Sequence, residues 1–285
     1  MPAPLTVLLP VALLLLAGCG ADMRTPPSPS FDPTPAWGTF LGQIVTAEGL
    51  IDYELLRADP EPLADFVGYI AVHGPETDGY RLLDDNRRLA WHLNAYNALV
   101  LWGILEHWPL SSVHDVKGPL GTPSAFFWWP RFGVDNERMN LHRYEQNVIL
   151  ATYEEPLAHA ALNCASRSCP PLRGELYRAK ALENQLADQM RRWVASGSAV
   201  TMEGDPASGG RFVFNAIFDW YAEDFAIWAG ATTPCQAIRP YAASADTAAT
   251  VDTPNALTTA LDVAPDCPHT FAPYDWRLND ARAAP

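Results

Sequence analysis

Hydrophobic residues recur every three to four positions through most of the chain, which predicts a helix-rich protein. The strongest helical pattern runs from Asp85 to His107, and Pro109 ends it. Apolar residues lie on every side of this helix, so we expect it to run through the core. It also carries two amides, Asn94 and Asn97, which need hydrogen-bond partners if they are buried. We expect them either to hold neighbouring backbone or to line a site.

Shorter patterns predict further elements. A second amphipathic helix is expected over 179–194. Alternating apolar and polar residues predict a hairpin over 132–141 and a strand over 211–214. The apolar run over 157–163 is best interpreted as a short buried strand.

These elements indicate the α+β class, with one helix-rich domain over residues 37–285 around a small, mainly antiparallel sheet. A papain-like arrangement is one option within that class. After residue 232, prolines and alanines dominate and the periodicity weakens, so this part is expected to be weakly structured.

The N-terminal sequence indicates where in the cell the protein is located. Residues 7–16 form an apolar run of signal-peptide length, too short to span a bilayer. The sequence Leu-Ala-Gly-Cys at 16–19 looks like a bacterial lipobox, in which the cysteine is lipidated. We therefore predict a signal peptide over 1–18, a lipidated Cys19, and a Pro/Ser-rich tether over 19–36 that lifts the domain off the membrane.

This anchor defines the expected location and the first partner. The partner is the membrane, reached through the lipid, on the periplasmic face of the bacterial cell envelope. Gly20 and not Asp follows Cys19, so we expect the outer membrane. A further envelope ligand or protein partner is expected, but its identity is not indicated.

Composition and charge exclude some function classes. The chain has 285 residues, of which 48% are hydrophobic and 11% aromatic, enough for a substantial core. Its formal net charge of −14 argues against nucleic-acid binding, which needs basic surface. Gly118 to Gly121 is not a phosphate loop, because no Gly-Lys-Ser/Thr follows. No cofactor is predicted.

The densest chemistry lies in residues 159–171, HAALNCASRSCPP. We call this stretch the cysteine segment. It brings together one imidazole, one amide, two thiols, two hydroxyls and one guanidinium: His159, Asn163, Cys164, Ser166, Arg167, Ser168 and Cys169.

Once Cys19 is assigned to the lipid, four cysteines remain in an oxidising compartment. Four cysteines allow three pairings. The economical one joins Cys164 to Cys169 and Cys235 to Cys267. The first bridge would hold Ser166 and Arg167 in a rigid turn that faces a ligand, which favours an envelope binding or scaffolding module.

The alternative is a thiol hydrolase or acyl transferase, with Cys164 as nucleophile and His159 as base. A papain-style constellation would add an orienting amide, Asn163 or Asn97. In a regular strand, however, His159 and Cys164 would face opposite ways. Glu145 acting with His159 would be compatible with a bridged turn.

A zinc site is the third option, and a purely structural segment without a ligand is the fourth. Cys164, Cys169 and His159 with a remote histidine could supply ligands. No second Cys/His pair with helical spacing exists in the sequence, so we predict no metal site.

Several segments match known sequence patterns. They are Ile51-Asp52-Tyr53, the helix Leu93 to Leu99, Met139-Asn140-Leu141 with Glu145, the stretch from His159 to Leu172, Tyr177, Gln185-Leu186, Phe218 to Phe225, and Tyr274-Asp275-Trp276. Together they resemble the bacterial and plant family known as domain of unknown function 547. That family has a histidine directly after the glutamate, where this chain has Gln146. The resemblance implies no established activity.

We expect the ligand site to form where the cysteine segment meets the central helix. Its side chains should converge within one cleft: Asn94, Asn97, Glu145, His159, Asn163, Cys164, Ser166 and Arg167.

Overall fold

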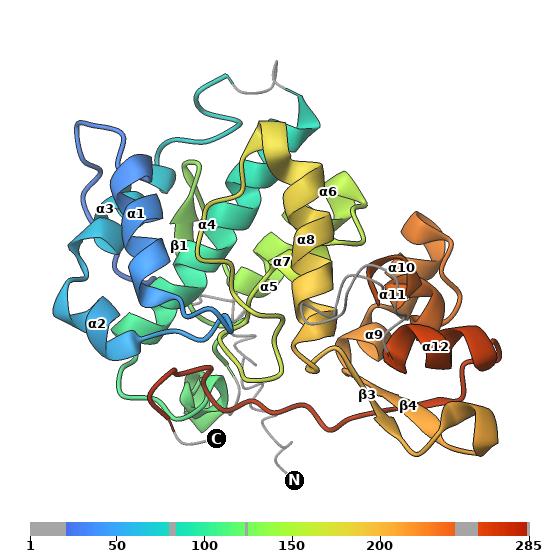
Figure 1. Cartoon of the computed structure of the whole chain (residues 1–285). Coiled ribbons are helices and arrows are strands. Elements are labelled where there is room, and N and C mark those ends of the chain that lie inside the picture. The colour runs from blue at the N-terminus through green and yellow to red at the C-terminus, as the bar shows by residue number, and fades with distance from the viewer. Residues whose placement is uncertain (1–20, 80–83, 123–124, 243–255, 284–285) are drawn as a thin grey trace, which may run out of the picture.

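A computed structural model of the chain describes residues 21–79, 84–122, 125–242 and 256–283 (Figure 1). The predicted signal peptide and Cys19 lie outside these residues. The longer helices are α1 (Thr34–Ile44), α2 (Tyr53–Ala58), α3 (Glu61–Ile70), α4 (Asp85–Glu106), α8 (Leu182–Ala195), α10 (Ala222–Ala229), α11 (Pro234–Ala242) and α12 (Ala256–Val263).

Short helical turns and strands connect them. The short turns are η2 (Val113–Asp115), η3 (Pro119–Gly121), α5 (Leu141–Arg143), the π-helix η4 (Tyr144–Leu150), α6 (Ala151–Tyr153), α7 (Ala158–Ala161), η5 (Ala179–Ala181), η6 (Pro206–Ser208) and α9 (Ile217–Trp220). The strands are β1 (Phe132–Val134), β2 (Glu137–Met139), β3 (Val200–Glu203), β4 (Arg211–Phe214) and β5 (His269–Phe271).

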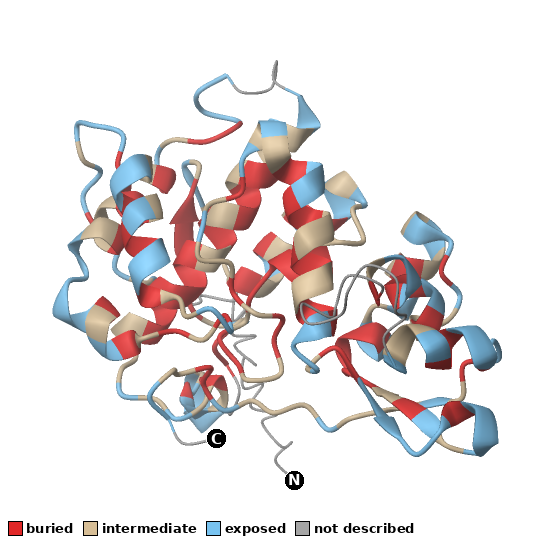
Figure 2. Ribbon diagram, in the orientation of Figure 1, coloured by how far each residue is buried: buried red, intermediate tan, exposed pale blue. Residues whose placement is uncertain are grey.

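Helix α4 is the centre of the larger hydrophobic core, as its pattern predicted. The Asp84 side chain begins the helix by accepting a hydrogen bond from the Arg87 N–H. Most of its length is buried (Figure 2), and it packs against α3, η4, α5 and η5. Although α4 is long, no helix in the described part of the chain is apolar enough over sufficient length to cross a bilayer.

A second core forms around α8 and the strands that follow it. Trp193 of α8 stacks on Phe218, with ring centroids 5.0 Å apart, and Phe212 and Phe214 of β4 are fully buried beside them. The α+β class is confirmed, but the strands form two small sheets and not one. β1 and β2 are antiparallel, whereas β4 pairs antiparallel with β3 and parallel with β5.

The predicted hairpin is confirmed. Asp135 and Asn136 form its two-residue turn, and both have positive φ, which short polar residues tolerate. The Asp135 carboxylate accepts hydrogen bonds from the N–H groups of Glu76 and Thr77, which fixes the turn against the loop after α3.

Two local predictions were wrong. Within the run over 157–163, Ala158–Ala161 form helix α7 and not a strand, because the three alanines favour helix. The part after residue 232 is not weakly structured where it is described. It contains α11, α12 and β5, and the disulfide between Cys235 and Cys267 joins α11 to the segment before β5.

The predicted tether also behaves differently from a free spacer. Residues 21–33 form neither a helix nor a strand, and they lie against the domain. The Arg131 N–H donates to the Ala21 carbonyl, the Met23 N–H donates to the Arg131 carbonyl, and the Trp102 indole donates to the Arg24 carbonyl. Backbone outside helices and strands leaves its polar groups unpaired, so the domain's donors and acceptors can bind it.

The C-terminal segment, residues 272–283 after β5, runs back across the molecule, along the lower edge in Figure 1. Its backbone pairs with three distant regions, through Ile51 N–H to Asn279, Leu278 N–H to Ser111, and Arg167 N–H to Arg277 carbonyl groups. The Tyr53 hydroxyl also donates to the buried Asn279 side chain at 2.8 Å. This segment therefore fixes the cysteine segment from outside.

Candidate functional site

A cavity of about 180 Å³ opens where the two hydrophobic cores meet. We call it the aromatic pocket. Its walls come from α4, the loop before β1, η4, α7, the cysteine segment, α9 and the C-terminal segment. The lining residues are Tyr96, Phe127, Trp128, His142, Glu145, His159, Leu162, Cys164, Cys169, Ile217, Trp220, Tyr221, Tyr274 and Trp276.

Glu145 is the carboxylate of this pocket. It lies in the first turn of the π-helix η4, a helix type that is common at functional sites. The hydroxyls of Tyr96 and Tyr221 each donate to one of its oxygens at 2.6 Å, and the Gln146 amide donates at 3.2 Å. Burial, and after it the charge of Glu145, raises the pKa of both tyrosines, so these hydroxyls stay protonated donors.

His159 lines the same pocket and forms a buried dyad with Asp224. Its Nε2 lies 2.9 Å from a carboxylate oxygen of Asp224 on α10, and its side chain is 1% exposed. The imidazole packs on the Tyr221 ring with centroids 4.1 Å apart. Asp224 therefore fixes the orientation of this ring, and Tyr221 links the dyad to Glu145.

Cys164 and Cys169 are joined by a disulfide, and the second predicted pair, Cys235 and Cys267, is bridged as well. In this state Cys164 has no thiolate. The Tyr274 hydroxyl lies 3.1 Å from both Cys164 Sγ and the Ser166 hydroxyl. Burial raises the pKa of Tyr274, so its proton is retained. The bridge is thus a fixed part of the pocket wall.

Two of the predicted amides stand behind this wall. Asn97 donates to the Ala161 carbonyl and accepts from the Asn163 N–H, both at 2.9 Å. The Asn163 side chain in turn donates to the Pro170 carbonyl and accepts from the N–H of Ala165, whose φ is +61°. These bonds hold the cysteine segment in its turn and attach it to α4.

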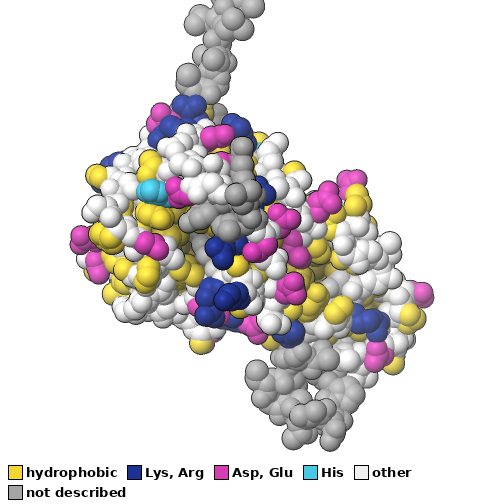
Figure 3. Space-filling view, turned by 90° about the horizontal axis from the view of Figure 1, so that it is seen from above, with side chains coloured by type: hydrophobic (Ala, Val, Ile, Leu, Met, Phe, Trp, Pro, Cys, Tyr) yellow, Lys and Arg dark blue, Asp and Glu magenta, His cyan; other side chains and the backbone are white. Residues whose placement is uncertain are grey.

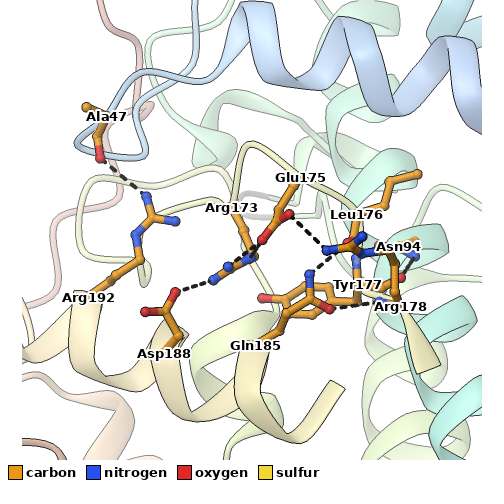
Figure 4. Close-up of polar contacts among 10 residues, drawn as sticks. All are labelled: Ala47, Asn94, Arg173, Glu175, Leu176, Tyr177, Arg178, Gln185, Asp188 and Arg192. Atoms are coloured by element: carbon orange, nitrogen blue, oxygen red, sulfur yellow. Dashed lines mark hydrogen bonds and ion pairs between the residues drawn. The ribbon is translucent and has the colours of Figure 1, made fainter. Parts of the chain in front are cut away.

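Asn94 lies outside the aromatic pocket. Its amide pairs with both backbone groups of Tyr177, at 2.9 Å each (Figure 4). Beside it, Arg173 bridges Glu175 and Asp188. The surface carries other such pairs, since the face in Figure 3 shows small groups of basic side chains with acidic ones beside them and no continuous basic stripe.

The expected single cleft is therefore only partly formed. Glu145, His159 and Cys164 line the aromatic pocket. Ser166 and Arg167 line a separate hollow together with Gly49 and Pro171, and Arg167 donates to the Ala283 carbonyl. The three amides Asn94, Asn97 and Asn163 do not line the pocket, because each side chain is turned to hydrogen-bond neighbouring backbone. The functional roles assigned to these residues stay predictions.

The zinc alternative has no ligand set among the described residues. Its two sulfurs are bonded to each other, and in the described ranges no group of three or more His, Cys, Asp or Glu side chains is placed to hold a metal ion.

Sequence reasoning missed most of the pocket wall. The tyrosines that bind Glu145, the Asp224 partner of His159, and the rings of Tyr274 and Trp276 were not proposed as site residues. A signal was present, because Tyr96, Tyr221, Asp224, Tyr274 and Trp276 all lie in the segments that resemble the family.

The comparisons with known proteins cover part of the chain. The family described as "Protein of unknown function, DUF547" matches residues 80–194. This range contains Tyr96, Glu145 and the cysteine segment, whereas Tyr221 and Tyr274 follow it. No curated protein and no solved structure matches the chain.

Proposed function

We propose that this chain, which belongs to the DUF547 family through residues 80–194, is a ligand-binding protein of the bacterial cell envelope. One observation carries the proposal: the Glu145 carboxylate is held by two tyrosine hydroxyls inside a cavity of about 180 Å³ that is walled by aromatic rings. Small-molecule sites are typically concave and mostly apolar, with a few placed polar groups. The aromatic pocket has that character.

The Cys164–Cys169 bridge supports binding by keeping the wall rigid. A turn that is already ordered loses little conformational entropy when a ligand arrives. Hydrogen bonds from Asn97 and Asn163 hold the same turn from behind. The pocket is thus organised in advance of its ligand.

Binding in the pocket is tested by screening small cations, polyols and carboxylic acids with tryptophan fluorescence and calorimetry. Trp220 lines the pocket and is 50% exposed, so Trp220→Ala should weaken binding at least about tenfold at little cost in folding. Ile227→Ala is the control, because Ile227 is 66% exposed and does not line the pocket. Ligands that bind both variants equally, or no binding at all, would refute the proposal.

We further propose that a lipid on Cys19 anchors the protein to the outer membrane. The docking of Ala21 and Met23 on Arg131 supports a domain held close to the bilayer. Labelled palmitate should be incorporated by the wild-type chain and not by Cys19→Ser. Gly20→Asp should keep the label but move the protein to the inner membrane. Label retained in Cys19→Ser would contradict the anchor.

A thiol hydrolase or acyl transferase is the second candidate, favoured by one observation: Cys164 and His159 line the same pocket. It requires reduction of the bridge by an external dithiol, which gives up two electrons and two protons and becomes a disulfide itself. The Cys164 thiolate would then attack an acyl carbonyl and release the leaving group, and water would free the acid.

Reductant separates the two candidates. Iodoacetamide should not label Cys164 in the untreated protein, whereas labelling without reductant would contradict the fixed bridge. After dithiothreitol treatment, the hydrolase would cleave p-nitrophenyl acetate in the wild type and in Cys169→Ser, but not in Cys164→Ser. If the reduced protein is inactive while ligand binding persists, the binding function stands alone.

A further inference from the structure

The charge of the aromatic pocket is not balanced by the protein. Glu145 is half-buried, and no Lys or Arg lines the cavity. Within the described ranges Glu145 forms no ion pair, only hydrogen bonds with Tyr96, Tyr221 and Gln146. Removing a carboxylate from water is costly unless a partner compensates its charge. A ligand with a positive group would supply that compensation.

Neither nearby imidazole forms an ion pair with Glu145 in the described part of the chain. Burial lowers the pKa of His142, while the charge of Glu145 opposes this shift, so the lowered pKa favours the neutral ring. His159 is already paired with Asp224 through Nε2. The pocket therefore presents a negative end without a positive group of its own.

An aromatic cluster forms another part of the pocket wall. Trp220, Tyr274 and Trp276 form one cluster, with centroids 4.8 Å apart between Trp220 and Tyr274 and 4.4 Å apart between Tyr274 and Trp276. The face of an aromatic ring carries negative potential and attracts cations, most strongly in tryptophan. Trp128 adds another indole to the wall.

The charge of Glu145 argues against an anionic ligand. The hydroxyls of Tyr96 and Tyr221 donate to Glu145. The Tyr274 hydroxyl accepts from Ser166 and lies beside the disulfide bridge. An anion would meet the Glu145 carboxylate without a Lys or Arg in the lining to compensate its charge. The negative charge and the aromatic rings are therefore the features that favour a cationic ligand.

We infer that the aromatic pocket binds a small organic cation, either a quaternary ammonium or a protonated amine, with the positive group between Glu145 and the Trp220–Tyr274–Trp276 cluster. This inference rests on the proposed ligand-binding function. It assigns Glu145 to charge recognition and not to catalysis.

Choline and its neutral isostere 3,3-dimethylbutan-1-ol provide the test, since they differ in charge but hardly in shape. Calorimetry on the purified full-length chain should show choline binding at least about tenfold more tightly. Glu145→Gln should remove most of this preference. The matched control Glu137→Gln should keep it, because the Glu137 side chain is 64% exposed and lies outside the pocket.

A second variant guards against misfolding of Glu145→Gln. Trp220→Leu keeps apolar bulk at a half-exposed position but removes the indole face. It should weaken choline several-fold and leave the neutral isostere nearly unchanged. Equal loss for both ligands would mean that the ring contributes only apolar contact, which contradicts cation recognition.

The outcomes separate the inference from the function on which it rests. If choline and its isostere bind equally, or a neutral ligand from the screen binds better, and Trp220→Ala weakens that binding, the pocket is a site but not one for cations. If no ligand depends on Trp220, both the function and the inference fall.

Discussion

Asn97 donates to the Ala161 carbonyl and accepts from the Asn163 N–H, so both ends of its amide hold backbone and carry no net charge. Glu145 is different, because its two tyrosine partners only donate and leave its charge in place. At this scale the chemistry of the pocket depends on which polar groups the fold has not neutralised. Removing a hydrogen-bond partner of either residue would leave a buried polar group unsatisfied. This would lower the free energy of unfolding by about 1–3 kcal/mol.

A buried histidine on α4 makes stability depend on pH. Burial, and after it the charge of Arg88, lowers the pKa of His92 from 6.5 to about 4, while Asp135 opposes the shift. Its Nδ1 lies 2.9 Å from the Tyr144 hydroxyl. The unfolded chain binds this proton below pH 6.5, but the folded chain binds it only near pH 4. The free energy of unfolding should therefore fall by about 2 kcal/mol between pH 7 and pH 5.

Urea unfolding of the wild type and His92→Gln at both pH values checks this expectation. The variant should lose about 2 kcal/mol less than the wild type over the same interval. Exposed carboxylates and other histidines titrate in both proteins and cancel in the comparison. An identical loss in the two proteins would show that His92 is not the titrating group.

Single residues were predictable from sequence only where their chemistry was distinctive. Glu145, His159 and Cys164 were identified and do line the pocket. The sequence also placed Asn97 on a buried helix. It could not show that the amide would meet backbone 64 residues further along the chain. The tyrosines were missed because a phenol that binds a carboxylate looks, in sequence, like a core aromatic.

At the scale of elements, the long helices were predictable from their own sequences. The patterns of α4 and α8 repeat over several turns, so their periods are clear. Helix α7 has four residues, too few to show a period, and was mistaken for a strand. The pairing of β4 with β5 was not predictable because it joins Phe212 to His269, far apart in sequence.

The turn between α1 and α2 shows how closely elements approach the cysteine segment. Gly49 has φ +79°, and a Cβ there would lie 2.4 Å from the Pro171 Cβ. Gly49→Ala should therefore lower the free energy of unfolding by about 3 kcal/mol, through backbone strain and overlap together. Gly197→Ala is the matched control.

Gly197 has φ +74° and open space around it, so only the backbone cost of about 1 kcal/mol applies. Denaturant unfolding of both variants measures the difference. Equal destabilisation would mean that Pro171 moves aside without cost. The choline titration of Gly49→Ala would then show whether the cysteine segment had shifted.

At the scale of the whole molecule, we expect the two disulfides to differ in what they stabilise, the fold in one case and the pocket wall in the other. Cys235–Cys267 closes a loop of 32 residues in the second core, whereas Cys164–Cys169 spans 5 residues at the pocket. In the loop-entropy account, the longer bridge contributes about 4 kcal/mol and the shorter one about 2 kcal/mol. Replacing Cys235 and Cys267 with alanine should therefore destabilise the fold more.

Thermal unfolding of the two double variants tests this order. The Cys164→Ala/Cys169→Ala protein should unfold closer to the wild type but bind pocket ligands more weakly, because its wall has lost its clamp. The Cys235→Ala/Cys267→Ala protein should show the opposite pattern at temperatures where it is folded. A reversed order of stability would mean that the short bridge holds more of the fold than its loop length indicates.

The α+β class followed from patterns within each segment, but the division into two cores did not. It depends on which apolar faces meet, and the pocket forms at that boundary from residues between Tyr96 and Trp276. The acidic composition said little about the pocket, since net charge describes the average surface and not one cavity.

The C-terminal segment is the last part of the pocket to be synthesised. Tyr274 and Trp276 leave the ribosome after every other residue of the pocket, and their segment pairs with Ile51, Ser111 and Arg167. Contacts over such separations form late, after the local helices. A nascent chain can therefore build α4 and its neighbours while the pocket still lacks one side. The pocket is therefore complete only after this segment has been made and has paired with the rest of the domain.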